Sequence, residues 1–502
     1  TRIGIGEIYG FGTYGERETI GATFFRYPDA FDNVPEIYPN GFRPESVGQN
    51  EDLSLTGGVR SEVLGWDVDA SVTFGRNQFD YGAQNTLNAS LGPLSPTRFR
   101  SGTHIFEQTS ANIDFVRSFE APLFQGPVTF ATGLEFRNEA YESRRGDPAS
   151  FAAGPFDLAI GAQGAPGLTP DDEADIERDV WSVYGEVGGD LTPQLFLEAA
   201  ARYEDYSDFG EEATGKLAFL YRLSDSVRLR GAISNSVRAP GLQQVGFADT
   251  TLNFGVGRSL VRTRTLPVAN PIAQSLGAEA LRPETSINYS LGASAELAPG
   301  LRVTVDAFRV AVDDRITLSD RFFGPALEAF VQAQPGGAGV QSVRFFTNAI
   351  DTETEGVDLV VTYERPLAGG ALELSAAFTY ATTDIAHFAP TPAALTALNP
   401  NFALIGVEEI KTIEEADDLI TTFNALLLIA RLEGGAIAES MASVDPAAIV
   451  SDVTELYEPV AEDAGLSLAV SAPSGLSLVA NRELVSQAIA NLVDNAIKYS
   501  AS

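Results

Sequence analysis

The stretch Trp66-Asp-Val-Asp-Ala-Ser-Val-Thr-Phe74 alternates apolar and polar side chains one by one. Because successive side chains of a β-strand point to opposite faces of its sheet, this period of two predicts a strand with one apolar and one polar face. The same pattern recurs at residues 128–137, 195–204, 227–234 and 301–307. The sequence therefore predicts a mainly β structure up to about residue 410.

The connections between these strands are of two kinds. Short turns are predicted at residues 223–226, 298–300 and 367–370, whereas residues 143–178 and 245–279 form long polar stretches. Strands of about ten residues with short turns at one end and long loops at the other are typical of outer-membrane β-barrels. A large soluble β-sandwich or a solenoid is the alternative, and loops this long without a fixed repeat length weaken it.

Composition excludes several function classes. The chain has 33 basic and 68 acidic residues, a net charge of −35, which argues against nucleic acid as a partner. It has no cysteine, which excludes disulfides, thiol nucleophiles and thiolate metal sites. The two histidines, His104 and His387, have no ligand or base spacing and are predicted to be ordinary polar residues of a strand or loop.

No apolar run approaches the roughly 18 residues that a membrane helix needs, so a membrane would have to be crossed by strands. The chain opens on Thr1 and shows no signal peptide, from which we expect the true start to lie elsewhere.

Several segments resemble the barrel of TonB-dependent receptors, which import siderophores, cobalamin and sugars across the outer membrane. In the order typical of that family, they are residues 202–210 with 215–216, 228–240, 281–292, 303–316 and 348–358. The resemblance extends through residues 395–410. It implies that residues 1–410 form part of an antiparallel outer-membrane β-barrel in contact with membrane lipid, and it carries over no substrate residue.

One proline and one glycine predict where strands end or begin. Pro240 is predicted to end a strand, because proline cannot donate to the next rung of the ladder. Gly356 is predicted to let a strand restart after a turn. The family's plug, its energy-coupling box for the TonB system and its last strands are not recognised in the sequence. We therefore expect a barrel portion that neither closes properly nor couples to an energy source.

The composition changes near residue 411. Of 31 phenylalanines only Phe423 lies beyond it, and of 47 glycines only four do. Residues 413, 416, 420, 423, 427 and 430 are apolar at alternating spacings of three and four, which predicts a helix ended by Gly434-Gly435. A second helix is predicted at residues 447–464, short strands near 466–470 and 476–479, and a last helix from Asn481.

The last predicted helix carries the candidate chemistry. Asn491, Asn495 and Lys498 share one face and could hold a hydrated cation and a phosphate chain. From the spacing alone, an ordinary amphipathic helix with a solvated face is the favoured interpretation.

This region resembles sensor histidine kinases. Residues 417–434 resemble the second dimerisation helix (411–440), and residues 481–500 resemble the N box of the ATPase domain (441–502, truncated). The resemblance implies ATP and Mg²⁺ as cofactors, with Asn495 as the metal ligand, Lys498 on the phosphates, and Asn491 and Tyr499 lining the pocket. Such kinases homodimerise and serve a response regulator. No histidine follows His387 and the glycine-rich ATP boxes are missing, so no kinase activity and no catalytic residue are predicted.

Three hypotheses remain. The chain is a receptor and transporter fragment of the outer membrane, an ATP-dependent histidine kinase, or an accidental chimera with no function of its own. The compartments conflict, because barrels lie in the outer membrane and kinase cores need cytoplasmic ATP.

Overall fold

A computed structural model describes residues 2–3, 6–254, 260–337, 339–367, 370–407, 410, 429–433, 442–444 and 478–480, and the single positions 447, 450 and 454. The chain divides into two compact units. One comprises Thr1–Ala293, Asp306–Val357 and Thr379–Phe423, and the other Ser294–Val305, Asp358–Phe378 and Asn424–Ser502. The dominant element is one sheet that contains 18 of the described strands.

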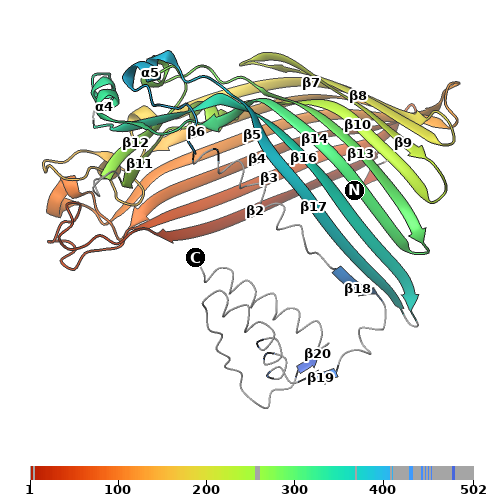
Figure 1. Ribbon diagram of the computed structural model, residues 1–502, viewed down its shortest axis with the longest axis horizontal. Helices are drawn as coiled ribbons and strands as arrows, with labels where there is room; N and C mark the ends of the chain where they lie inside the picture. The colour runs from red at the N-terminus through yellow and green to blue at the C-terminus, as the bar shows by residue number, and fades with distance from the viewer. Residues whose placement is uncertain are drawn as a thin grey trace. The chain divides into compact units, whose positions relative to one another are not determined.

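Most of the sheet is an antiparallel meander in which each strand pairs with the next along the chain (Figure 1). After the short β1 (Arg2–Ile3), its strands are β2 (Gly6–Ala22), β3 (Glu45–Val63), β4 (Trp66–Gln84), β5 (Arg98–Glu120), β6 (Pro127–Arg145), β7 (Ala174–Asp190), β8 (Leu195–Tyr206), β9 (Gly210–Arg222) and β10 (Val227–Arg238). The sheet continues through β13 (Glu284–Ala298), β14 (Leu301–Leu318), β16 (Ser342–Leu367) and β17 (Gly370–Phe388).

These strands confirm the predictions made from alternation. The five predicted segments lie within β4, β6, β8, β10 and β14, and the three predicted turns separate β9 from β10, β13 from β14 and β16 from β17. β10 ends at Arg238, just before Pro240, as predicted. The period of two was the right signal because one face of the sheet is apolar along its length.

The register shows which side chains share a face, because directly paired residues of an antiparallel sheet point the same way. One row across β2 to β8 is apolar and consists of Ile8, Val59, Ala70, Ile113, Leu134, Val183 and Tyr203. The row next to it, on the other face, consists of Glu7, Arg60, Asp69, Asp114, Gly133, Tyr184 and Arg202. The sheet therefore has one apolar and one polar face.

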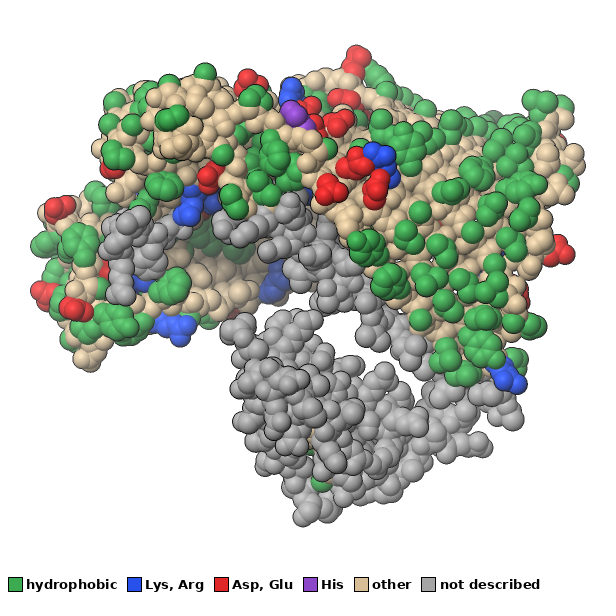
Figure 2. Space-filling model, in the orientation of Figure 1, with side chains coloured by type: hydrophobic (Ala, Val, Ile, Leu, Met, Phe, Trp, Pro, Cys, Tyr) green, Lys and Arg blue, Asp and Glu red, His purple; other side chains and the backbone are tan. Residues whose placement is uncertain are grey.

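The apolar face is exposed. Leu134, in the middle of β6, is 55% accessible, and Ile8, near the start of β2, is 46% accessible. Figure 2 shows hydrophobic side chains gathered over the strands at the right of the view, where charged side chains are sparse. A contiguous apolar surface of this extent is rare on proteins that fold in water, and it points to a non-aqueous environment.

Aromatic rings mark two levels of this face. Trp66 packs edge-on against Phe115 and Phe130, with ring centroids 6.5 and 6.2 Å away. Six residues farther along β6, Phe136 packs against Trp181 at 4.7 Å. At about 3.4 Å per residue the two levels are roughly 20 Å apart along the strand. Aromatic girdles above and below an apolar band are a feature of strands that cross a membrane.

The long connections carry the remaining elements. They are the α-helices α1 (Pro148–Phe151), α2 (Leu242–Gly246), α3 (Pro271–Ser275), α4 (Pro325–Gln332) and α5 (Ala393–Leu398), the 3-10 helices η1 (Ala89–Leu94) and η2 (Pro170–Asp172), and the strands β11 (Asp249–Phe254), β12 (Leu260–Leu266) and β15 (Phe322–Phe323). Their largest core includes Leu266, Leu276, Leu327, Phe345 and Leu395. None of the helices in the described part of the chain has the length and hydropathy to cross a membrane.

Three predictions need correction. The polar stretch 245–279 contains the β11–β12 hairpin, in which Asp249–Phe254 pairs with Leu260–Thr265. Gly356 does not follow a turn but lies inside β16, where the ring of Phe308 occupies the space that a side chain would need. Residues 429–433, the predicted end of a helix, form β18 (Ile429–Glu433), which pairs with residues 371–375 of β17.

The pairing of β18 has a physical reason. The free edge of β17 presents unpaired N–H and C=O groups, and a neighbouring segment that satisfies them gains hydrogen bonds that a helix end would not. One short strand, β18, therefore follows residue 410. The expectation that the family's last strands are missing stays a prediction. β19 (Ala442–Val444) pairs with β20 (Leu478–Ala480), near the strand predicted at 476–479. The predicted helices at 413–428 and from 481 onward lie outside the described residues.

Candidate functional site

The polar face of the sheet is lined by charged side chains that pair across strands. Arg60 on β3 and Asp69 on β4 stand directly opposite each other, and their Nε and Oδ2 atoms are 2.5 Å apart. The Arg60 guanidinium also lies over the ring of Tyr9 at 4.7 Å. Tyr9 in turn donates its hydroxyl hydrogen to Asp69 Oδ1 at 2.7 Å. Three strands are thus joined through one carboxylate.

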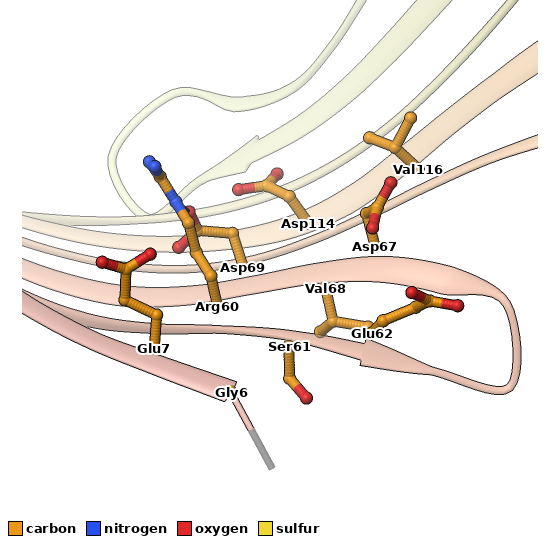
Figure 3. Close-up of a pocket in the computed structure, with 10 residues that line it drawn as sticks. All are labelled: Gly6, Glu7, Arg60, Ser61, Glu62, Asp67, Val68, Asp69, Asp114 and Val116. Carbon is orange, nitrogen blue, oxygen red and sulfur yellow. Dashed lines mark hydrogen bonds and ion pairs between the residues drawn. The ribbon is translucent and has the colours of Figure 1, made fainter. Parts of the chain in front are cut away.

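A cavity of about 680 Å³ opens at this point, near the short turn between β3 and β4. Figure 3 shows Glu7, Arg60, Asp69 and Asp114 pointing to the same side of the sheet. The lining of the cavity contains one guanidinium, that of Arg60, and five carboxylates. The carboxylates belong to Glu7, Glu62, Asp67, Asp69 and Asp114. The excess negative charge attracts cations. Within the described ranges, however, no three acidic or histidine side chains converge in a way that could hold a metal ion.

A second cavity, of about 460 Å³, lies farther along the polar face between β7 and β10. Its charged lining residues are neutralised locally. Lys216 Nζ lies 2.7 Å from Glu198, and Arg202 Nη2 lies 2.6 Å from Glu135. Thr214, Ser234 and Ser236 add hydroxyl groups. This cavity therefore offers mainly uncharged hydrogen-bonding groups to whatever passes along the face.

Three side-chain contacts on this face cross a whole strand at the position of a glycine. Tyr9 on β2 reaches Asp69 on β4 over Gly58 of β3, and Tyr184 on β7 reaches Asp114 on β5 over Gly133 of β6, with an O···O distance of 2.7 Å in both. Arg230 on β10 reaches Asp306 on β14 over Gly292 of β13, with Nε and Oδ1 2.8 Å apart. We call these three contacts the glycine crossings. In each, the middle residue has no side chain, and any Cβ there would occupy the path of the bond.

Arg178 fixes the polar face to the connections beyond it. Its side chain is 2% exposed and pairs with Asp208 at 2.6 Å and with Glu139 at 3.5 Å. It also donates to the carbonyl oxygen of Pro240 at 2.9 Å, and its guanidinium lies 5.3 Å from the ring centre of Phe209. One buried cation therefore joins β6, β7, the β8–β9 turn and the segment after β10.

His104, on β5, lies in a stack of aromatic rings from neighbouring segments. Its ring is parallel to those of Tyr81 and Tyr141, with centroids 5.6 and 6.1 Å away, and Phe247 stacks on it at 5.5 Å. Its Nδ1 atom lies 2.9 Å from the hydroxyl of Tyr141. The prediction of an ordinary strand residue fits both histidines, since His387 lies in β17 with 65% of its side chain exposed.

The β11–β12 hairpin carries a buried charge cluster that the sequence did not reveal. Arg264 pairs with the buried carboxylate of Asp172 and donates to the carbonyl oxygen of Gly336 at 3.1 Å. Burial, together with the positive charge of Arg264, lowers the pKa of Arg262. Burial raises the pKa of Asp249. In the sequence, the only sign of this cluster was that Arg262 and Arg264 lie on one face of a strand. Their partners could not be predicted, because they are distant in sequence.

The four residues predicted to bind ATP and Mg²⁺ cannot be placed by this structure. Asn491, Asn495, Lys498 and Tyr499 all lie outside the described residues. Their nucleotide and metal roles stay predictions.

Comparison with known proteins matches two families to different parts of the chain. Residues 2–403 match the family model described as TonB dependent receptor-like, beta-barrel. Over a shorter stretch, the chain is 31% identical over 128 residues to a probable sensor protein, PcoS, of Escherichia coli, covering 24% of this chain and 27% of that protein. It is 30% identical over 125 residues to the sensor-like histidine kinase SenX3 of Mycobacterium tuberculosis, covering 23% and 30%.

The solved structures that match include two siderophore receptors named PirA. The one from Acinetobacter baumannii is 13% identical with a TM-score of 0.45, covering 75% of this chain and 53% of that chain. The one from Pseudomonas aeruginosa is 16% identical with a TM-score of 0.41, covering 69% and 60%. The chain thus spans less than a third of the length of these curated relatives and at most three fifths of these solved structures.

Proposed function

The chain belongs to the family of TonB dependent receptor-like β-barrels, and from this premise we propose that it acts as an outer-membrane receptor and transporter. The observation that carries the proposal is the two-faced register of the sheet. The exposed apolar face, with Leu134 55% accessible, suits membrane lipid, and the ion-paired polar face suits a water-filled path.

The family implies the outer membrane as the location and the TonB system as the energy-coupling partner. Siderophore-like, cobalamin-like and carbohydrate ligands are the candidates for its cargo. Of these, an uncharged or cationic ligand suits the polar face best, because the chain carries a net charge of −35 and the cavity beside Asp69 and Asp114 is acidic.

The proposal is tested by expressing the full chain in a Gram-negative host and separating its membranes. We expect the protein in the outer-membrane fraction, with a gel mobility that shifts on heating because a folded strand wall resists detergent until it is boiled. A protein that stays soluble, or that sediments as aggregate without a heat shift, contradicts the proposal.

A second candidate function rests on the similarity of part of the chain to sensor kinases. We propose that this part derives from a histidine kinase whose nucleotide site would use Asn491, Asn495, Lys498 and Tyr499 with ATP and Mg²⁺. Because residues 388–502 contain no histidine that could accept a phosphoryl group, we expect no autophosphorylation within this part of the chain. Mg²⁺-dependent binding of a fluorescent ATP analogue by the full chain, abolished by Asn495→Ala, would show that a nucleotide site persists.

A further inference from the structure

The β11–β12 hairpin carries three buried polar atoms that have no hydrogen-bond partner in the part of the chain that the structure describes. They are the Nε atoms of Arg262 and Arg264 and the Oγ1 atom of Thr250. Thr250 stands directly opposite Arg264, and Arg262 lies two positions along the same strand, so the three side chains share one face of the hairpin. Thr250 is 2% and Arg264 is 5% exposed. Buried donors and acceptors without partners are rare in folded proteins, and their gathering on one face points to a group that completes them.

The charges on this face are also not balanced. Arg264 is neutralised by the buried carboxylate of Asp172 and donates to the carbonyl oxygen of Gly336. The backbone N–H of Arg262 donates to Gln341, but its guanidinium makes no hydrogen bond or ion pair with any residue that the structure describes. Asp172 attracts this guanidinium only from beyond ion-pair distance. An arginine keeps its proton at neutral pH, so its positive charge remains and favours a bound anion.

The segment before β16 passes over the two arginines. Gly336 and Gly339 have φ angles of +77° and +72°, which glycine adopts without strain. A Cβ at Gly339 would lie 3.8 Å from Nη1 of Arg262, so this segment runs beside the unpaired guanidinium. Asp171 lies near Gly336, but it is exposed and water screens its charge. The face is therefore enclosed by three connections, those between β6 and β7, between β10 and β13, and between α4 and β16.

We infer that this face of the β11–β12 hairpin binds a small free oxyanion of the phosphate or sulfate type, held by Arg262, Arg264 and Thr250. The Cα atoms of residues two apart on a strand are roughly 7 Å apart, a spacing that lets two guanidinium groups donate to one tetrahedral anion. Water could satisfy the three atoms but would leave the charge of Arg262 uncompensated. Because the donors are buried, a small free anion fits better than a phosphate group carried on a lipid. We call this place the oxyanion site, and it does not depend on the proposed transport function.

The test uses the full chain in a non-ionic detergent and a zwitterionic buffer at neutral pH, both free of phosphate. Backbone hydrogen exchange in residues 249–254 and 260–266 is followed by mass spectrometry with sodium phosphate, sodium sulfate or sodium chloride at equal ionic strength. Phosphate at ten times its dissociation constant should slow this exchange about tenfold, because it binds only the closed hairpin. Sulfate should also slow it. Exchange that is equally fast in phosphate and in chloride would overturn the inference.

Arg262→Gln distinguishes an anion site from a structural role of the arginine. Because the guanidinium has no partner among the described residues, this variant should exchange no faster than the unmodified chain when no oxyanion is present. It should also abolish the effect of phosphate. Arg282→Gln is the matched control, since it removes an arginine that is 63% exposed and paired with Asp314. It should keep the full effect of phosphate.

Thr250→Val gives a second, milder variant in case Arg262→Gln does not fold. It removes the hydroxyl with little change in volume and should raise the phosphate concentration needed for half of the protection several-fold. Phosphate that protects both variants as well as the unmodified chain would overturn the inference. So would faster exchange of Arg262→Gln without any oxyanion, because the guanidinium would then have a partner within the protein.

Discussion

At the scale of single residues, the glycines of the polar face leave room for side chains of neighbouring strands to lie across them. Gly133 has no side chain, so the Tyr184 ring can lie across β6 and its hydroxyl can reach Asp114. A hydrogen bond to a carboxylate is stronger than one between neutral groups. The crossing therefore stabilises three strands through one contact that a side chain on the middle strand would prevent.

We predict that Gly133→Val destabilises the folded wall by about 2–4 kcal/mol, from the lost hydrogen bond and the crowding of Tyr184. Gly75→Val is the matched control. It lies on the same polar face, and no atom lies within 4 Å of its virtual Cβ. The readout is the temperature at which the gel heat shift occurs. Equal shifts for both variants would show that the crossing contributes nothing.

Buried and exposed arginines should differ sharply in their contribution to stability. Arg178→Met leaves the carboxylates of Asp208 and Glu139 without their buried cation and should cost about 3–5 kcal/mol. Arg144→Met breaks the ion pair between Arg144 and Glu142, whose side chains are 53% and 38% exposed, respectively. This substitution should lower the free energy of unfolding by less than about 1 kcal/mol. Urea unfolding of the reconstituted protein measures both. A cost for Arg178→Met as small as that for Arg144→Met would refute its role as an anchor.

At the scale of elements, the β11–β12 hairpin responds to pH through Asp249. Burial raises the pKa of this carboxyl above its ordinary value of 3.8, and the nearby carboxylate of Asp172 adds to the shift, although Arg344 opposes it. Folding therefore favours the protonated form. The contribution of Asp249 to stability is complete below pH 3.8 and is lost as the pH rises through the raised pKa.

We accordingly expect hydrogen exchange in residues 249–254 and 260–266, corrected for the intrinsic pH dependence, to accelerate as the pH rises above the ordinary aspartate range. Asp249→Asn should flatten this response, because the amide stays neutral throughout. Asp225→Asn, in the β9–β10 turn, is the control and should behave like the unmodified chain. A flat response in the unmodified chain would mean that the hairpin is indifferent to the charge on Asp249.

At the scale of the whole molecule, the two faces of the sheet should respond oppositely to the same substitution. Leu134→Arg places a charge on the exposed apolar face and should weaken membrane insertion by about 2–4 kcal/mol if it lies near the bilayer midplane. Ser54→Arg lies on the polar face beside the open space above Gly75 and should be tolerated. The fraction of protein showing the heat shift measures insertion. If both variants insert equally well, the apolar face does not meet lipid.

The sequence predicted what depends on local alternation and missed what depends on long-range pairing. Trp66 to Phe74 alternates because each strand lies between lipid and a polar interior, so β4 could be predicted from nine residues. The glycine crossings could not, because Tyr184 and Asp114 are 70 positions apart and only the register brings them together. Gly356 was misread for the same reason. A glycine in a strand can mark a turn or a ring lying above it, and only the neighbouring strand distinguishes the two.

The glycine crossings of the polar face also favour the correct register of the strands during folding. Because side chains alternate between faces, a slip of one residue at either of two consecutive interfaces sends the donor or the acceptor of a glycine crossing to the wrong side. The contact therefore forms only when both consecutive strand pairs are in the correct register, whereas a bond between adjacent strands depends on the register of one pair alone. The trios β2–β3–β4, β5–β6–β7 and β10–β13–β14 share no interface, so each can reject a misaligned hairpin independently of the others.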